Sequence, residues 1–266
     1  MTRLHALHAP GRLLVLPNVW DALSARLVEE AGAEAIATGS AALAWVHGHP
    51  DGESLPLAHV VRAVARVARA VKVPVTVDLE RGYAPDPEGV AEAVARVVDA
   101  GAEGVNLEDG GGPAEALAAK IAAVRRRLGA RVFVNARTCV VLHGLVAPER
   151  AAAEVLARAR LFADAGGLFV PRLADAETIQ AITRGTPLPL NVLLVPGLPP
   201  PAALRELGVR RLSVGPRVAE AAYALARRAA RDLLASGAYE TLLAADLTYA
   251  EANALFARGA GAPPDP

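Results

Sequence analysis

Short apolar runs rich in valine, leucine and isoleucine alternate along the chain with longer segments in which apolar positions recur every three to four residues. The short runs are typical of strands buried on both faces, and the longer segments are typical of amphipathic helices. The pair Asp86-Pro87 predicts a helix start, because aspartate caps a first turn and proline fits its first position. We expect strands at 12–17, 33–39, 73–79, 103–109, 131–137, 167–173, 188–195 and 210–215.

Eight strands separated by helices, with no run of hairpins, predict one parallel sheet. Eight is also the number that closes a (β/α)8 TIM barrel, and 266 residues suffice for one such domain. An open doubly wound sheet is the alternative, but no GxGxxG fingerprint follows an early strand. We therefore expect a single barrel domain over residues 1–266, covered by helices that include 21–31, 59–71 and 87–100.

The C-terminal part of the chain exceeds what a barrel needs. A helix at 217–236 would cover the last strand, and a helical extension at 238–258 follows it, before an end at 259–266 that we expect to be frayed. An apolar surface left in water is a liability for a monomer, so we expect this extension to pack on a second copy of the chain. The alternative is that it plugs the bottom of its own barrel. Its apolar residues are Leu242, Leu243, Leu247, Leu255 and Phe256.

Composition narrows the class of protein. Hydrophobic residues make up 53% of the chain and aromatic residues only 4%, so alanine, valine and leucine fill the core. Lys plus Arg equals Asp plus Glu at 28 each, which gives no overall attraction to nucleic acid or to a membrane surface. A single cysteine excludes an internal disulfide. The N-terminus lacks a signal-peptide pattern, and four prolines interrupt the longest apolar stretch, so we expect a cytoplasmic protein.

Acidic side chains gather where the predicted strands end. Asp78 and Glu80 follow the third strand, Glu108 ends the fourth and Arg137 ends the fifth. The carboxyl ends of barrel strands meet on one rim, where barrel enzymes have their active sites. Carboxylates are ligands that Mg2+ prefers, and an arginine beside them can clamp a ligand carboxylate. Each acid alone could merely cap a helix, but the set predicts a Mg2+ site for an acidic ligand.

Four sequence motifs at these positions resemble those of the isocitrate lyase/phosphoenolpyruvate mutase superfamily. DLERGY at 78–83 resembles its metal motif D-x-D-x-G-[YF]-G, and GVNLEDG at 104–110 resembles its fourth-strand element. HGHPDGE at 47–53 is similar to its G-x-P-D loop, and NART at 135–138 to its fifth-strand element. The motifs occur in the family's order, and the likeness runs from about Pro17 to Leu255. The resemblance implies a TIM barrel that exchanges C-terminal helices in a homodimer or homotetramer.

The resemblance also implies a metal site. Asp78 would ligate Mg2+ directly, while Glu80 and Glu108 would hold its water molecules. Asp51 would reach the water shell or the substrate, and with Glu108 and Arg137 it would form the catalytic set.

The expected substrate site faces that metal. Arg137 would bind a substrate carboxylate, and backbone N–H groups of Gly39, Ser40 and Ala41 would bind the other end. Asn191, on the seventh strand, is a further candidate contact. A 2-oxo acid would chelate the metal through its carboxylate and keto oxygens, and the metal with Arg137 would stabilise an enolate-like charge. We therefore expect a Mg2+-dependent carbon–carbon lyase or decarboxylase for a small 2-oxo acid such as oxaloacetate or 2-oxoglutarate.

Four departures from the family pattern limit this expectation. Glu80 stands where the metal motif has Asp, Ala84 stands where it ends in Gly, and Cys139 stands where Asp is common. We expect Cys139 to be buried packing; a nucleophile is the alternative. The loop at 110–120, GGGPAEALAAK, lacks the K-[KR]-C-G-H motif of the lyases, so isocitrate or methylisocitrate cleavage is not expected. The alternatives are a phosphorus–carbon bond enzyme of the phosphonomutase or phosphonopyruvate hydrolase type, and a non-catalytic 2-oxo acid binding protein.

Overall fold

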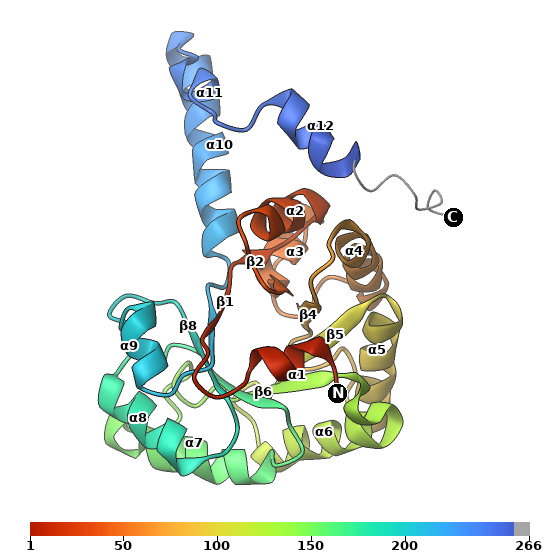
Figure 1. The fold of residues 1–266 in the computed structure, drawn as a ribbon, viewed down its shortest axis with the longest axis vertical. Helices are drawn as coiled ribbons and strands as arrows, with labels where there is room; N and C mark the ends of the chain where they lie inside the picture. The colour runs from red at the N-terminus through yellow and green to blue at the C-terminus, as the bar shows by residue number, and fades with distance from the viewer. Residues whose placement is uncertain (258–266) are drawn as a thin grey trace.

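The fold is a barrel of parallel strands surrounded by helices (Figure 1), as a computed structural model describes it for residues 1–257. All strand pairs in this range are parallel, and nine short strands follow the order β1-β9-β8-β7-β6-β5-β4-β3-β2. They are β1 (Leu14–Leu16), β2 (Asn18–Val19), β3 (Ile36–Thr38), β4 (Val75–Asp78), β5 (Ala102–Glu108), β6 (Phe133–Arg137), β7 (Gly167–Val170), β8 (Leu190–Leu193) and β9 (Arg211–Ser213).

The first strand of the barrel is divided by a proline. β1 pairs with β9 and β2 pairs with β3, and only Pro17 separates β1 from β2. Proline has no N–H to donate to a neighbouring strand, so the ladder is interrupted there and changes partner. The nine short strands therefore form eight barrel positions, and the sheet closes through residues 14–19. This confirms the predicted (β/α)8 barrel.

Helices cover the outside of the barrel in the predicted alternation (Figure 1). The Asp86 carboxylate caps its helix by accepting a 2.9 Å hydrogen bond from the backbone N–H of Gly89, as the sequence predicts. The helices after the strands are α2 (Ala22–Glu30), α3 (Ser40–Val46), α4 (Leu57–Ala70), α5 (Pro87–Asp99), α6 (Ala114–Leu128), α7 (Ala151–Leu161), α8 (Ala176–Gly185), α9 (Pro201–Glu206) and α10 (Arg217–Ser236). Two 3-10 turns, Gly129–Arg131 and Pro148–Arg150, complete the loops.

A short N-terminal helix that the sequence pattern did not indicate closes the bottom of the barrel. This helix, α1 (Arg3–Leu7), buries Leu4 against Leu14, Leu16 and Phe133, and Leu14 and Phe133 begin their strands. The His8 ring stacks on Phe133 with 4.2 Å between ring centroids. The barrel therefore has an apolar floor, and the carboxyl ends of the strands remain open.

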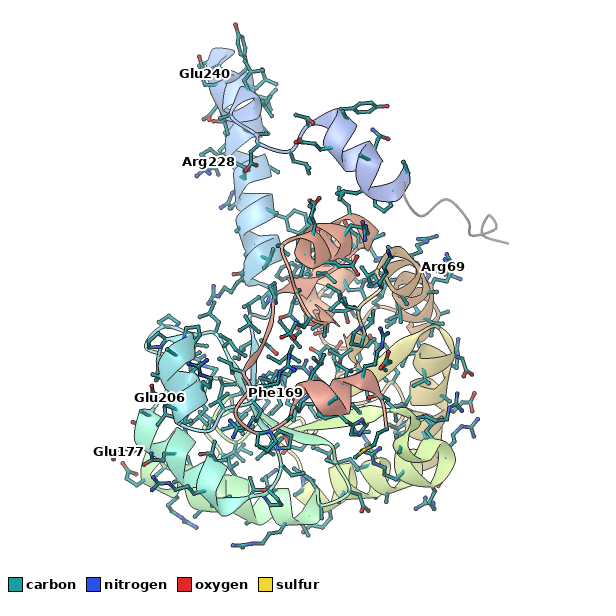
Figure 2. All side chains as sticks on the ribbon, in the orientation of Figure 1. Arg69, Phe169, Glu177, Glu206, Arg228 and Glu240 are labelled. Atoms are coloured by element: carbon teal, nitrogen blue, oxygen red, sulfur yellow. The ribbon has the colours of Figure 1, made fainter. Side chains whose placement is uncertain are left out.

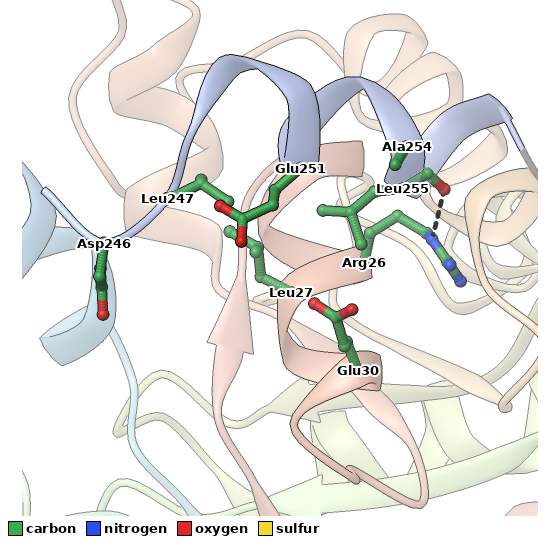
Figure 3. A pocket seen from close by; sticks show the side chains of 8 residues that line it. All are labelled: Arg26, Leu27, Glu30, Asp246, Leu247, Glu251, Ala254 and Leu255. Carbon is green, nitrogen blue, oxygen red and sulfur yellow. Dashed lines mark hydrogen bonds between the residues drawn. The ribbon is translucent and has the colours of Figure 1, made fainter.

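The predicted C-terminal helical extension at 238–258 consists of two helices within the described residues. It forms α11 (Glu240–Leu243) and α12 (Tyr249–Ala257), joined by residues 244–248, while residues 258–266 lie outside the described range. α10 projects away from the barrel, and α12 turns back toward α2 (Figure 1). There Arg26 Nε donates a 3.1 Å hydrogen bond to the Leu255 carbonyl, beside a groove of about 430 Å3 (Figure 3). The extension thus packs on the side of the barrel and not on its bottom.

The surface of the C-terminal segment that contains α10, α11 and α12 is partly apolar. Leu242, Leu243, Leu247 and Phe256 are exposed, whereas Leu255 is buried against α2. Figure 2 shows Arg228 and Glu240 on this segment and Phe169 inside the ring of helices. None of the helices within residues 1–257 is long and apolar enough to cross a membrane.

Candidate active site

A cavity of about 160 Å3 opens where the carboxyl ends of the strands converge. It is smaller than the groove beside α12, but its lining comes from loops and strands all around the barrel, as in other barrel active sites. Its charged side chains are Asp51, Asp78 and Arg137, and no histidine or cysteine of the described chain lines it. The cavity therefore offers two carboxylates and a guanidinium, and no imidazole or thiol of the described residues lines it.

The carboxylate of Asp78, at the end of β4, has one oxygen with a hydrogen-bond partner and one oxygen without a partner among the described residues. Its Oδ2 accepts a 3.1 Å hydrogen bond from Ser40 Oγ and lies 3.8 Å from Arg137 Nη1. Its Oδ1 is buried and has no hydrogen-bond partner within residues 1–257. Leaving a buried carboxylate oxygen without a partner is costly, and a cation would remove that cost. The Thr38 hydroxyl holds the backbone by accepting from the Asp78 N–H at 3.2 Å.

Arg137, at the end of β6, lies between two acids. Its Nε is 3.1 Å from Glu108 Oε2, although the angle is not that of a hydrogen bond, and its guanidinium carbon lies 5.6 Å from the centre of the Phe169 ring. Burial lowers the pKa of Arg137, but the charges of Asp78 and Glu108 outweigh that effect and raise it. The guanidinium is therefore a permanent positive charge at the cavity wall.

The other two acids of the predicted metal set lie beside the cavity without lining it. Burial, together with the charges of Asp78, Asp51 and Glu53, raises the pKa of Glu80 to about 7, and a hydrogen bond from the Glu53 backbone opposes the shift. Burial also raises the pKa of Glu108, against the effect of Arg137. The backbones of Glu53, Glu80 and Tyr83 all adopt positive φ angles, an unfavourable conformation for these residues that tends to occur at functional sites.

The arrangement of these acids suits a divalent cation that keeps water ligands better than a cation that is coordinated by protein side chains on all sides. Within the part of the chain that the structure describes, no three His, Cys, Asp or Glu side chains converge closely enough to hold a metal ion. Mg2+ does not need such a cage, because it keeps several water molecules and binds proteins through one or two carboxylates. The partnerless Oδ1 of Asp78 fits a direct ligand, while burial and the charges of neighbouring acids raise the pKa values of Glu80 and Glu108, a shift that Arg137 opposes at Glu108.

The residues predicted to bind substrate do not all reach the cavity. Gly39, Ser40 and Ala41 line it, but the Gly39 N–H donates to the Val19 carbonyl at 3.1 Å. Ser40 and Ala41 lie in the first turn of α3, where backbone N–H groups have no intrahelical acceptor. Asn191 is buried beneath the cavity and does not line it. The structure therefore gives Gly39 N–H and Asn191 no direct contact with a ligand.

A layer of amides lies beneath the cavity. Asn135 Nδ2 donates to Asn106 Oδ1 at 2.9 Å and to Asn191 Oδ1 at 3.0 Å, and Asn191 contacts the Ser213 hydroxyl at 3.2 Å. Asn106 and Ser213 line the cavity floor, although the sequence analysis did not select them. Strand alternation could have found Asn106 and Asn135, because each lies two residues before a selected residue and points to the same side.

Asn18 closes the barrel beside the site. Its Oδ1 accepts from the backbone N–H groups of Val214 and Gly215 at 3.0 and 2.9 Å, and its Nδ2 donates to the Thr38 carbonyl at 3.1 Å. One side chain thus joins the ends of three strands next to the cavity.

The short loop after β5 is anchored. Asp109 accepts hydrogen bonds from Thr138 Oγ1 at 2.6 Å and from Arg158 Nη1 at 2.8 Å, and Arg158 also donates to the Gly112 carbonyl at 2.8 Å. These contacts fasten the glycine turn to α7 and to the loop after β6. The fully buried Cys139 thiol lies beside this junction, and burial raises its pKa to about 12, so it is protonated at neutral pH. This confirms the expected buried position of Cys139.

Comparison with known proteins gives consistent relatives. The family model described as phosphoenolpyruvate phosphomutase matches residues 4–234. A solved structure, a "putative phosphonomutase" from Burkholderia cenocepacia, is 45% identical with a TM-score of 0.79, and the match covers 85% of this chain and 96% of that one. An uncharacterized protein of Mycobacterium tuberculosis is 38% identical over 79% of this chain and 81% of its own length. An oxaloacetate decarboxylase of Ectopseudomonas mendocina is 29% identical over 86% and 81%.

Proposed function

The chain belongs to the phosphoenolpyruvate phosphomutase family, within the isocitrate lyase/phosphoenolpyruvate mutase superfamily of enzymes, and we propose that it is a Mg2+-dependent enzyme for small 2-oxo dicarboxylic acids. It would break or form the carbon–carbon bond next to the keto group, with decarboxylation of an oxaloacetate-like acid as the reaction that fits best. The relative described as an oxaloacetate decarboxylase supports this choice of substrate.

One observation carries the proposal. The cavity places the partnerless Oδ1 of Asp78 and the guanidinium of Arg137 on neighbouring walls, with 3.8 Å between Asp78 Oδ2 and Arg137 Nη1. A cation held by Asp78 and a cationic side chain beside it would together face the oxygen-rich end of a 2-oxo acid. Glu80 and Glu108, which lie beside the cavity without lining it, would hold water molecules of the cation, because Mg2+ keeps several waters when it binds through one or two carboxylates.

Bound Mg2+ would act as a Lewis acid toward the keto oxygen. Arg137 would bind the adjacent carboxylate of the substrate with its fork of N–H donors, in competition with Glu108. The N–H groups of Ser40 and Ala41 would orient the remaining oxygens, and Asp51 would lie at the cavity wall toward the cation's water shell. Arg137 would also stabilise the negative charge that develops on the keto oxygen as the bond breaks.

The absence of an imidazole or thiol from the cavity, for the residues described, favours decarboxylation over other lyase reactions. When a 2-oxo acid with a carboxylate on the next carbon loses CO2, the bonding electron pair moves into the keto group. No base is needed for that step, and solvent can supply the proton that completes the product. Cleavage of a hydroxy acid, in contrast, requires a base to remove the hydroxyl proton, and among the described residues only the carboxylates of Asp51 and Asp78 line the cavity as bases.

Two other functions have specific support. Identity of 45% to a protein described as a "putative phosphonomutase" favours phosphorus–carbon bond chemistry. The short, anchored loop after β5 favours a protein that binds a 2-oxo acid without turnover.

Product analysis separates these three functions. Purified protein is incubated with oxaloacetate or phosphonopyruvate, with Mg2+ or with EDTA, and pyruvate and phosphate are measured against the protein-free reaction. We expect Mg2+-dependent pyruvate formation from oxaloacetate above that background. Phosphate release from phosphonopyruvate alone would support the phosphonate function. Binding of both acids with no turnover would support the binding protein.

A further inference from the structure

An arginine is buried inside the barrel directly beneath the candidate site. Arg211 begins β9, is 1% exposed and points into the barrel, like Ser213 two residues later on the cavity floor. Arg211 Nε lies 3.4 Å from Ser213 Oγ, and its Nη1 has no hydrogen-bond partner. Across the described residues its guanidinium forms no ion pair with a carboxylate. A buried guanidinium without a counterion is costly, so its retention calls for a function.

The surroundings of Arg211 leave its charge uncompensated from the sides and from below. Asn135 and Asn191, the neighbouring interior side chains, are neutral amides, and the barrel floor is the apolar cluster around Leu14 and Phe133. His8 is held neutral, because burial and the charge of Arg211 lower its pKa to about 4. Neutral amides and an apolar floor do not compensate the charge of Arg211, so its field extends through the barrel interior and reaches the open end.

Asp78 is the acid whose charge acts on Arg211 in the absence of a ligand. Burial lowers the pKa of Arg211 to about 10, and the charge of Asp78 opposes that effect, so the guanidinium stays charged at neutral pH. Asp78 also pairs with Arg137, with 3.8 Å between Asp78 Oδ2 and Arg137 Nη1, and Glu108 is the second acid that pairs with Arg137. A cation bound to Asp78 would take up the same negative charge. The positive charge of Arg211 would then be left uncompensated, and a second negative charge on the ligand would compensate it.

We propose that Arg211 is a specificity-determining residue that makes the site select dianionic 2-oxo acids over monoanionic ones of the same length. This inference rests on the proposed function and names the charge of its substrate. Arg137 would bind one carboxylate at the wall. The charge of Arg211, one side chain below Ser213, would stabilise the second carboxylate above the cavity floor without touching it.

The test compares two ligands that differ in charge and share a five-carbon chain. Calorimetric titrations with 2-oxoglutarate and with 2-oxopentanoate, at saturating Mg2+, are run on the wild-type protein, Arg211→Met and Arg211→Lys. The matched control is Arg210→Met, because Arg210 is the half-buried neighbour and its Nη1 donates to the Val209 carbonyl. Arg210→Met also removes one positive charge, but from a side chain outside the barrel interior.

We expect the wild-type protein, Arg211→Lys and Arg210→Met to prefer 2-oxoglutarate. Arg211→Met should lose that preference by about tenfold, the effect of one charge several ångströms away in a partly screened interior. The same variant should bind Mg2+ about three- to tenfold more tightly in the absence of a ligand, because Asp78 is freed from a neighbouring positive charge. If Arg211 had a merely structural role, Arg211→Met would bind Mg2+, 2-oxoglutarate and 2-oxopentanoate all more weakly. Melting temperatures confirm that each variant is folded.

The outcomes that contradict the proposal are distinct. Equal loss of both 2-oxo acids in Arg211→Met, or an unchanged ratio of their affinities, would overturn the role of Arg211 and leave the proposed function standing. A wild-type protein that binds neither acid with Mg2+ would overturn the proposed function, and this inference with it.

Discussion

Arg137 and Glu108 are direct neighbours in the β5–β6 register, and the Nε of Arg137 lies 3.1 Å from Oε2 of Glu108. The contact lacks hydrogen-bond geometry, so the pair is held by charge and Nε stays free to bond. A carboxylate arriving in the cavity can therefore replace Glu108 without breaking a good hydrogen bond. Glu108 is thus the carboxylate that accompanies Arg137 when no ligand is bound.

Arg137→Lys keeps the charge and removes the planar fork of donors. We expect the affinity for 2-oxoglutarate with Mg2+ to fall by about 1.5–3 kcal/mol, the range for hydrogen bonds to charged groups. Calorimetric titration measures the change. Arg126→Lys is the matched control, because Arg126 pairs with Glu88 on the exposed surface. Equal affinity in Arg137→Lys and the wild-type protein would show that Arg137 is structural.

Arg158 anchors the loop after β5 through a fully buried carboxylate, that of Asp109. Arg158→Met leaves this carboxylate with neutral donors only, so we expect the free energy of unfolding to fall by about 3 kcal/mol. Urea denaturation measures this loss. Arg126→Met removes an exposed ion pair and should cost about 0.5 kcal/mol or less. Similar losses in the two variants would contradict the anchoring role.

Because of His8, we expect the stability of the folded protein to depend on pH in the acid range. Its pKa is lowered from 6.5 to about 4, first by burial and then by the charge of Arg211. The unfolded chain therefore takes up a proton below about pH 6.5 that the folded chain refuses until about pH 4. The stability contributed by neutral His8 is fully present above that range and is lost, by about 3 kcal/mol, as the pH falls through it.

His8→Gln removes this titration and keeps a side chain that can hydrogen-bond to the Leu4 carbonyl, as His8 Nδ1 does at 2.7 Å. We expect the stability of the variant to fall less steeply between pH 6.5 and pH 4. Denaturation curves across this range provide the comparison. Parallel pH profiles for the two proteins would show that His8 does not titrate as its burial indicates.

The exposed apolar residues of α10 to α12 lead us to propose a homo-oligomer. Leu234, Leu243 and Tyr249 are 85%, 75% and 88% exposed, which is a liability in water. We expect the full-length chain to be a dimer or tetramer at micromolar concentration, and a chain without residues 238–266 to have a lower mass per particle. Light scattering measures both. A monomeric full-length chain contradicts the oligomer, and an unchanged mass after truncation contradicts the part played by the extension.

The periodicity of the sequence predicted the barrel well because its long elements carry strong patterns. The predicted helix at 217–236 coincides with α10, and the cap at Asp86 begins α5 as expected. α1 and α3 were missed, because five and seven residues are too few to show a helical period. The sequence predicts the helical extension, and the structure divides it into α11 and α12 at residues 244–248.

The site was predictable where residues end a strand and less so below the rim. Asp78 and Arg137 lie at the cavity as expected, because the carboxyl ends of all barrel strands meet there. Asn191 was placed at the rim, yet Leu193, two residues later, is the one that lines the cavity, so Asn191 lies one layer lower. The burial of Arg211 could not be expected from sequence, since arginine is almost never fully buried without a partner.

The coupling between Mg2+ and a 2-oxo acid at Asp78 tests the central claim most directly. The affinity for 2-oxoglutarate is measured by calorimetry in the wild-type protein and in Asp78→Asn, each with Mg2+ and with EDTA. We expect tight binding only in the wild-type protein with Mg2+, and a loss of at least about 100-fold in the other three cases, beyond what removal of an outer partner of a metal ligand causes. An Asp78→Asn protein that keeps Mg2+-dependent binding, or wild-type protein that binds equally well in EDTA, would contradict the account.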